Sequence, residues 1–266
     1  MSYIYLFMKA ETYFDKEQDA EYLFRKGGPF WHMYTPGTYT ETIFIETEDF
    51  IFCMNLIAQA AIRFPDVEIY TFEIMNNHLH LIVSGKEDAC RKMFDMIKEK
   101  LNRYLRNKGR QLNLSRFKCS LTLITDLKML RNEIVYVNRN GYSAHSQYTP
   151  FSYPWGAGGA YFNPITKELP KERFCDLPLK TRREICRSRE AELPEKIMVH
   201  KGIILPSCYC HIHEGESFFR SASHYFYIIS KNYEAYSAIA ERLHESVFIT
   251  DEEMFSVAVM LCMKRH

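Results

Sequence analysis

The chain has 266 residues, of which 47% are hydrophobic and 25% are charged. These proportions are ordinary for one large globular domain or a domain with an appendage, and no apolar run reaches the length of about 18 residues that a transmembrane helix needs. The N-terminus lacks the basic region and small-residue cleavage site of a secretory signal, and eight cysteines in so long a chain fit reduced thiols. We therefore expect a cytoplasmic protein without a membrane partner.

The net charge of +1 conceals an uneven distribution along the chain. Residues 1–85 carry 5 basic and 12 acidic side chains, a net of −7, and residues 141–266 carry 15 of each. Residues 86–140 carry 14 basic and 6 acidic side chains, a net of +8, which suits a polyanionic partner such as nucleic acid. A solvated helix face gives similar counts, so the charge pattern alone leaves both explanations open.

Strands and helices alternate through the first half of the chain. A charged stretch over 15–26 predicts a short helix that ends at Gly27-Gly28. The order predicts an α+β protein with the split β-α-β pattern of ferredoxin-like folds, one extra helix, and an antiparallel sheet with helices on one face. The expected strands are 30–34, 67–74, 78–83 and 120–125, and the expected helices are 48–63, 88–108 and 127–140.

The sequence changes character after residue 141. A segment rich in proline, glycine and aromatic residues, 148–164, predicts the end of the first domain. Beyond it we expect helices over 180–195, 221–244 and 251–266, and the last shows no stop signal, which indicates a chain that continues further. We divide the chain into an extension packed on the main domain (1–28), the main domain (29–162) and a mainly helical accessory region (163–266) for DNA binding or dimerisation.

The predicted strand 78–83 begins with two histidines, His78 and His80. Alternate side chains of a strand share a face, so these two imidazoles should project side by side. A pair at this spacing can bind one divalent metal ion. Hydrogen-bonded histidines on a half-exposed sheet are the more common explanation for an isolated His-x-His.

A second cluster of metal-ligand residue types lies in the accessory region, at Cys208, Cys210, His211 and His213. Zinc sites usually draw ligand pairs from two separate segments, and one stretch of six residues can hardly surround a metal tetrahedrally. A metal-binding or structural protein organised around this cluster is one function that this segment leaves open.

The predicted helix 127–140 carries Tyr136 away from its apolar stripe. At about 100° per residue, Asn140 lies one turn further along the same side. We expect the phenol and the carboxamide to be presented together, away from the packing face of the helix. The chain has 18 tyrosines, so a packing or surface role explains Tyr136 equally well in isolation.

Taken together, these segments resemble one family. Residues 74–82, Ile-Met-Asn-Asn-His-Leu-His-Leu-Ile, are similar to the histidine motif of the HUH-type tyrosine transposases of insertion sequences, and most similar to the REP-associated tyrosine transposases. Residues 136–144 resemble the family's nucleophile helix, Tyr-x-x-x-Asn, and residues 151–157 its Pro-Trp segment. The resemblance covers roughly residues 29–162. Asn76 and Gly141 stand where the family has proline.

This resemblance implies a function and a site. His78, His80 and Asn140 would hold Mg²⁺ or Mn²⁺, and Tyr136 would be the nucleophile. Metal-dependent cleavage of single-stranded DNA would leave a 5′-phosphotyrosine, which conserves the bond energy for rejoining. The two departures from the motif keep open an inactive or domesticated protein that only binds hairpin DNA.

The implied partner is single-stranded or hairpin DNA, bound by a nucleoid-associated protein that acts as a monomer or as a homodimer. Basic residues on and after the helix 88–108 are candidates for phosphate contacts, and nearby tyrosines for base stacking. The candidates are Lys92, Lys100, Arg103, Arg106, Arg110, Arg116 and Lys118.

Overall fold

The computed structural model describes residues 16–37, 41–143, 147–149, 151–231 and 233–244. Its centre is a four-stranded antiparallel sheet with the strand order β2-β3-β1-β4. The α+β class and the antiparallel sheet are confirmed. The strands are β1 (Phe30–Tyr34), β2 (Glu68–Ile74), β3 (Leu79–Ser84) and β4 (Ser120–Ile124).

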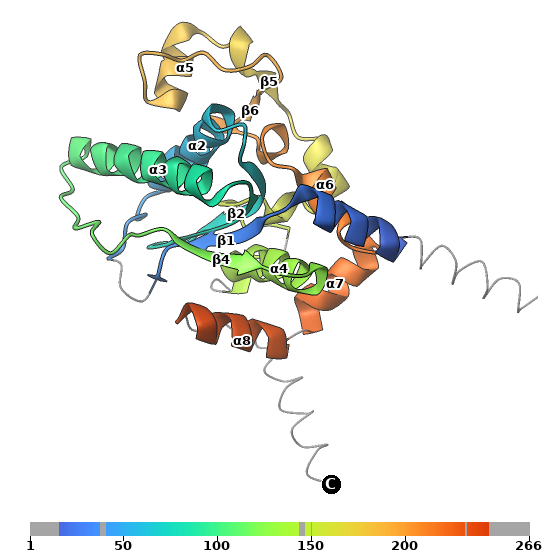
Figure 1. Cartoon of the computed structure of the whole chain (residues 1–266). Helices are drawn as coiled ribbons and strands as arrows, with labels where there is room; N and C mark the ends of the chain where they lie inside the picture. Colours follow the sequence, from blue (N-terminus) through green and yellow to red (C-terminus); the bar gives the residue numbers. More distant parts are fainter. Residues whose placement is uncertain (1–15, 38–40, 144–146, 150, 232, 245–266) are drawn as a thin grey trace, which may run out of the picture.

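Three long helices cover this sheet. All residues of β3 are buried, which requires cover on both faces. Figure 1 shows α2 (Thr47–Arg63) and α3 (Glu87–Asn107) on one side of the sheet and α4 (Leu127–Ser143) on the other. The expectation of helices on one face therefore holds for α2 and α3 only. Apolar periodicity did not predict the second layer because α4 covers polar strand residues, including His32 and Thr71.

The register of the sheet sets which side chains face α4. Tyr34 of β1 lies directly opposite His80 of β3, and His32 lies opposite Ile82. On the other neighbour of β3, Glu73 of β2 also lies opposite His80. Alternate residues of a strand share a face, so His32, Tyr34, Glu73 and His80 project to the same side of the sheet.

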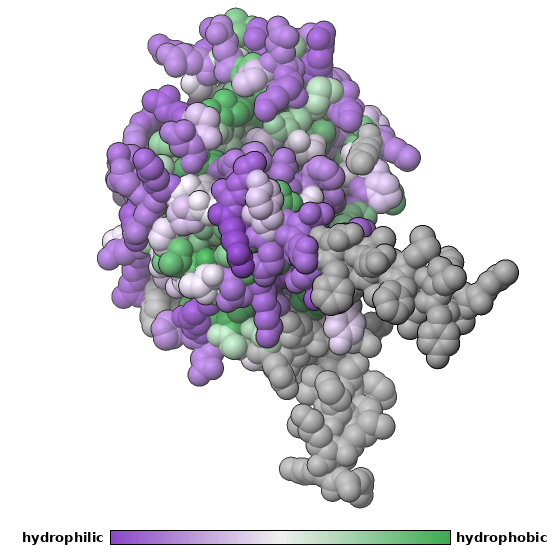
Figure 2. Space-filling model, turned by 45° about the vertical axis from the view of Figure 1, so that its right-hand side comes forward, coloured by the Kyte–Doolittle hydropathy of each residue, from purple (hydrophilic) through white to green (hydrophobic). Residues whose placement is uncertain are grey.

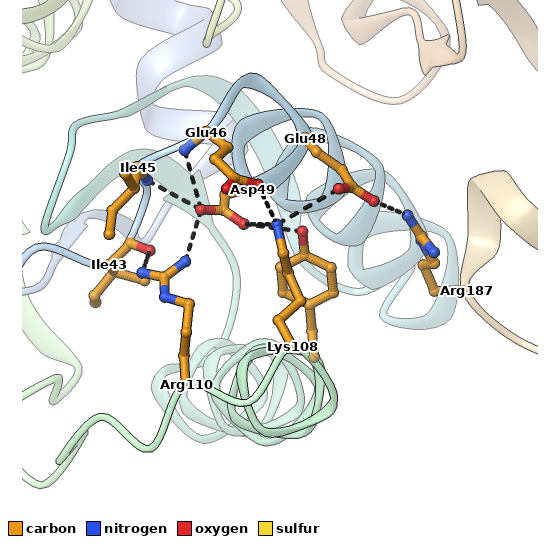
Figure 3. Close-up of polar contacts among 9 residues, drawn as sticks. Ile43, Ile45, Glu46, Glu48, Asp49, Lys108, Arg110 and Arg187 are labelled. Atoms are coloured by element: carbon orange, nitrogen blue, oxygen red, sulfur yellow. Dashed lines mark hydrogen bonds and ion pairs between the residues drawn. The ribbon is translucent and has the colours of Figure 1, made fainter.

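A buried carboxylate joins the N-terminus of α2 to the C-terminus of α3 (Figure 3). Asp49 is fully buried and accepts hydrogen bonds from the backbone N–H groups of Ile45 at 3.0 Å and Glu46 at 3.2 Å. Lys108 donates to it at 3.0 Å and Arg110 at 2.7 Å. Burial acts to raise the pKa of Asp49, but these donors outweigh it and lower the pKa to about 2.

The chain beyond α4 first forms a small second unit of structure. Three short antiparallel strands, β5 (Glu172–Arg173), β6 (Met198–His200) and β7 (Ile203–Ile204), pack with α5 (Leu179–Cys186). Strands of two or three residues are too short to show alternation in a sequence, so none was predicted. The helix expected over 180–195 ends at Cys186 because Arg187 adopts a left-handed backbone, φ 46°.

The remaining helices confirm a mainly helical C-terminal region. They are α6 (Ile212–Ser217), α7 (Ala222–Lys231) and α8 (Tyr233–Leu243), and the helix expected over 251–266 lies outside the described residues. Both α7 and α8 pack against α4, on the side away from the sheet (Figure 1). Single-turn 3₁₀ helices lie at Gly158–Ala160, Pro164–Lys167, Phe174–Asp176 and Pro206–Cys208.

One hydrophobic core runs through most of the molecule, from Ala20 to Leu243. A helix over residues 16–27 joins it, and its Glu17 pairs with Arg131 of α4 at 2.8 Å and with Arg220 at 2.7 Å. Residues from all three predicted segments of the chain therefore pack together. Within the described residues no helix is long and apolar enough to cross a membrane. The face drawn in Figure 2 is mostly hydrophilic, with small apolar patches.

Candidate functional site

The predicted histidine pair lies at the start of β3. His78 directly precedes the strand and is half-buried, and His80 lies within it and is fully buried. The centres of the two imidazole rings are 4.9 Å apart, and the ring planes are nearly perpendicular at 88°. The structure thus brings the two rings side by side, as the spacing of the motif predicts.

Tyr136 of α4 lies against this pair. Its ring centre is 5.9 Å from that of His80 and 6.2 Å from that of His32. The expectation that Tyr136 is presented away from the packing face is wrong, because only 4% of the residue is exposed. The phenol ring lies on the sheet side of α4 with the histidines, and α7 and α8 cover the outer side of this helix.

Asn140, the expected third metal ligand, follows Tyr136 by one helical turn. α4 continues without interruption past Asn140 to Ser143, so the two residues share a side of the helix as predicted. Asn140 is half-buried. Its neighbour Asn138 has a structural role, since it accepts a hydrogen bond from Thr71 and donates one to Tyr225 at 3.0 Å.

A buried polar chain stands behind His80. His80 Nδ1 lies 3.0 Å from His32 Nε2, and His32 Nδ1 lies 2.8 Å from a carboxylate oxygen of Glu133. Arg242 of α8 forms an ion pair with the other oxygen of Glu133. Burial acts to raise the pKa of Glu133, but His32 and Arg242 outweigh it and lower the pKa, so the carboxylate is ionised.

Sequence reasoning missed His32 and Glu133. The signal for Glu133 was its position three residues before Tyr136, which puts a charged side chain on the same side of the helix. His32 occupies an inward position of β1 and is fully buried. The pairing of β1 with β3 could not be read from the spacing of the motif.

His78 is also held by hydrogen bonds, through Asn77 and the backbone of Gly37. Asn77 Nδ2 donates to the carbonyl oxygen of Gly37 at 2.7 Å, and Asn77 Oδ1 lies 2.6 Å from His78 Nδ1. Position 37 has no room for a side chain, because a Cβ there would lie 2.6 Å from His78 Nδ1. The loop at residue 37 therefore fits closely around the Asn77–His78 pair.

Two further residues that the sequence did not single out flank His80 on the neighbouring strands. Tyr34 stacks on the His80 ring at 6.3 Å between centres, with an interplanar angle of 16°. Glu73 is buried and accepts a hydrogen bond from the backbone N–H of Gly141 at 2.5 Å. Burial raises the pKa of Glu73 well above its usual value, more than the Gly141 bond lowers it. Glu73 is therefore a protonated, neutral carboxyl group over a wider pH range than an exposed glutamate.

The ring geometry of His78 and His80 fits a shared metal ion. Two imidazoles that bind one ion through nitrogens at about 2.1 Å have ring centres roughly 5 Å apart, close to the observed 4.9 Å. No group of three or more His, Cys, Asp or Glu side chains in the described parts of the chain could hold a metal. A third protein ligand among them would be of another residue type, and the motif resemblance implies the amide of Asn140. Two imidazoles with oxygen ligands suit Mn²⁺ better than Mg²⁺.

The cysteine–histidine cluster of the accessory region does not converge. Cys210 is buried, and burial raises its thiol pKa well above the usual value. The side chain of His213 is 91% exposed and lies 3.7 Å from Glu216. His211 packs on the ring of Tyr70 instead. These separate environments favour individual local roles for the residues over the binding of one shared metal ion.

The basic candidates lie mostly on α3, across the sheet from α4, the helix that contains Tyr136 (Figure 1). Lys92 pairs with Asp88 at 2.6 Å, and Arg103 pairs with Glu99 at 2.7 Å. Arg110 is part of the Asp49 cluster described above, so its charge is already used in the fold. Lys100 donates to Gln59 at 3.2 Å, and Arg106, Arg116 and Lys118 are exposed.

The site therefore combines a phenol, two adjacent imidazoles, a buried hydrogen-bonded chain at His80 and a half-buried one at His78. Comparisons with protein-family models, curated proteins and solved structures find no match for this chain.

Proposed function

We propose that the protein cleaves and rejoins single-stranded DNA in a metal-dependent reaction with Tyr136 as the nucleophile. The observation that carries this proposal is the contact between the rings of Tyr136 and His80, which lie about 55 positions apart in the chain. A nucleophile held against metal-binding imidazoles is the arrangement that covalent phosphoryl transfer requires. The resemblance of residues 29–162 to HUH-type transposases supports the same chemistry.

In the proposed reaction the phenol oxygen of Tyr136 attacks a DNA phosphorus. A bond forms between that oxygen and phosphorus, the bond from phosphorus to the 3′-oxygen breaks, and the phenol proton passes to the departing 3′-oxygen directly or through water. Attack by a 3′-hydroxyl on the 5′-phosphotyrosine reverses the step and joins two strands without ATP. His78, His80 and Asn140 would hold Mg²⁺ or Mn²⁺, whose Lewis acidity would stabilise the charge on phosphate and leaving oxygen.

The burial of Tyr136 favours a second candidate function, a non-catalytic protein that binds hairpin DNA on the same fold. With 4% of Tyr136 exposed, a phosphate must displace covering side chains before it reaches the phenol. A protein that only binds DNA has no need of that opening. Both functions place the protein on the nucleoid in the cytoplasm, and they differ in whether a covalent product forms.

The chain offers a matched pair of tyrosines for the test. Tyr34 and Tyr136 both pack on His80, with ring centres 6.3 Å and 5.9 Å away. The full chain is incubated with Mn²⁺ and a library of end-labelled hairpin single strands, and covalent adducts are separated on denaturing gels. We expect adducts with wild type and Tyr34→Phe, and none with Tyr136→Phe. Salt-dependent binding by wild type with no adduct on any hairpin would select the non-catalytic function.

A further inference from the structure

We infer that two hydrogen-bond relays, one through Asn77 and one through His32, fix both His78 and His80 in the tautomer that carries the proton on Nδ1. Each imidazole then directs the lone pair of Nε2 toward one shared ion. The inference deepens the proposed function and rests on it for the role of that ion. Asn77 and His32 act in it as positioning residues, because neither would touch the ion or the DNA.

The first relay starts at a backbone carbonyl. The oxygen of Gly37 can only accept, so the Asn77 group 2.7 Å away must be its NH₂. This fixes the orientation of the amide and turns Oδ1 toward His78 Nδ1, at 2.6 Å. Because an amide oxygen also only accepts, His78 Nδ1 must carry a hydrogen. In the neutral ring the lone pair is then on Nε2.

The second relay starts at a carboxylate. Glu133 forms an ion pair with Arg242 through one oxygen and accepts from His32 Nδ1–H through the other at 2.8 Å. A neutral His32 then has its lone pair on Nε2, which accepts from His80 Nδ1–H at 3.0 Å. His80 is left with an unprotonated Nε2. The relay spans three elements, because Glu133 lies on α4, His32 on β1 and His80 on β3.

The burial of the second relay supports a role beyond packing. His32, Glu133 and His80 are all fully buried, and apolar side chains of similar size would fill this space without the cost of desolvating a carboxylate. A metal-binding imidazole usually has a hydrogen-bond partner of this kind on its other ring nitrogen, which fixes its tautomer and orientation. Two independent relays that both place the lone pair on Nε2 agree with one ion between the rings, whose centres lie 4.9 Å apart.

The direct test is the protonation of the four imidazole nitrogens. Long-range proton–nitrogen NMR spectra of the full chain with ¹⁵N-labelled histidine report which nitrogen of each ring carries hydrogen, with signals assigned by single His variants. We expect protonated Nδ1 and unprotonated Nε2 at both His78 and His80. A hydrogen on Nε2 of His80 with none on its Nδ1 in wild type would overturn the inference, since a doubly protonated His32 would then donate in the opposite direction.

Variants separate positioning from packing. His32→Phe should release the tautomer of His80 and weaken binding of Mn²⁺ alone roughly 10- to 100-fold, while His78 keeps its tautomer. His32→Gln supplies an amide oxygen in place of Nε2 and should restore both. If His32→Phe does not fold, two other variants test the inference. His32→Gln should keep the tautomer of His80, and Asn77→Leu should free the tautomer of His78 alone. Equal Mn²⁺ affinity in Asn77→Leu and wild type would overturn the inference.

These outcomes are distinct from those that test the proposed function. If both histidines carry the proton on Nδ1 and Mn²⁺ binds, but no DNA adduct forms, the inference about the relays holds and the proposed strand cleavage is wrong. A DNA adduct at Tyr136 with the opposite tautomer at His80 would overturn the relays and leave strand cleavage standing. Tyr34→Phe is the control for both, because it removes a polar group beside His80 and leaves both relays intact.

Discussion

His32 Nε2 and His80 Nδ1 lie 3.0 Å apart across the neighbouring strands β1 and β3. This hydrogen bond connects the proposed metal site to Glu133 of α4 and, through its carboxylate, to Arg242 of α8. A helix that follows the sheet by more than a hundred residues therefore takes part in the environment of the histidine motif.

The first prediction concerns Glu133. Glu133→Gln removes the charge that orients His32 and leaves Arg242 without its ion-pair partner at this position. We expect Mn²⁺ affinity to fall roughly 10-fold or more and the free energy of unfolding to fall by about 3 kcal/mol. Isothermal titration with Mn²⁺ and urea unfolding measure the two effects.

Glu17→Gln is the control for Glu133→Gln. Glu17 also pairs with buried or half-buried arginines, Arg131 and Arg220, but lies outside the site. It should lower stability and leave Mn²⁺ affinity unchanged. A similar loss of Mn²⁺ affinity in both variants would show that Glu133 acts through general stability alone.

The second prediction concerns Gly37. In Gly37→Ala the new methyl group would lie 2.6 Å from His78 Nδ1, so the ring or the loop must move. We expect weaker Mn²⁺ binding with little change in the core. Gly109→Ala is the matched control, since its Cβ meets nothing within 4 Å and its positive φ of 74° costs only local strain. Titration with Mn²⁺ should distinguish the two, and equal affinities would contradict the close fit around His78.

The third prediction concerns the pH dependence of stability at Asp49. Because the pKa of this carboxyl falls from 3.8 to about 2 in the folded protein, its contribution is present above pH 4 and is lost as the pH falls toward 2. Asp49→Asn should lower the free energy of unfolding at pH 7 by about 3 kcal/mol, since Lys108 and Arg110 lose their buried partner. Urea unfolding from pH 7 to pH 2 should show a shallower decline for the variant, and parallel curves would contradict this assignment.

The fourth prediction concerns Glu73, whose shift has the opposite sign. Burial raises the pKa of this carboxyl well above its usual 4.5, so its contribution is fully present below that pH and is lost as the pH rises through the raised pKa. Glu73→Gln stays neutral and still accepts from Gly141 N–H. Its stability relative to wild type should therefore increase with pH above 4.5, as measured by urea unfolding. A constant difference across the pH range would show that Glu73 titrates as an exposed glutamate.

The fifth prediction concerns the exposed basic residues. If Arg106, Arg116 and Lys118 contact phosphates, each replacement by alanine should reduce the salt dependence of single-strand binding by roughly 0.7 in the logarithmic slope. Arg110→Ala should instead reduce stability through the Asp49 cluster. Fluorescence anisotropy over a range of salt concentrations measures the slope. An unchanged slope in all three alanine variants would show that these three residues do not contact the DNA phosphates.

Much of the first half of the fold follows from local periodicity. The strands from β1 to β4 and the helices α2, α3 and α4 were predicted within a few residues, because each carries its own alternation or helical stripe. The burial of Tyr136 was not predictable, because its packing against His32 and His80 depends on how α4 lies on the sheet. The same holds for Arg110, whose partner Asp49 lies 61 positions away in the sequence.

The site was predictable where a motif is local and not where it depends on strand pairing. His78 and His80 are two positions apart on one strand, so their adjacency follows from the pleat. His32 and Glu133 lie 101 positions apart, and only the packing of α4 on β1 brings them together. Each residue falls within a predicted element, His32 in the strand 30–34 and Glu133 in the helix 127–140, but nothing in the sequence indicated that they meet.

The most direct test of the central claim is to locate the covalent bond between protein and DNA. The full chain is reacted with hairpin single strands and Mn²⁺, digested with nuclease and protease, and mapped by mass spectrometry. The account predicts a nucleotide attached to the peptide that contains Tyr136, with Tyr34 unmodified. A nucleotide on Tyr34 or any other residue, or no modified peptide with any hairpin, would contradict it.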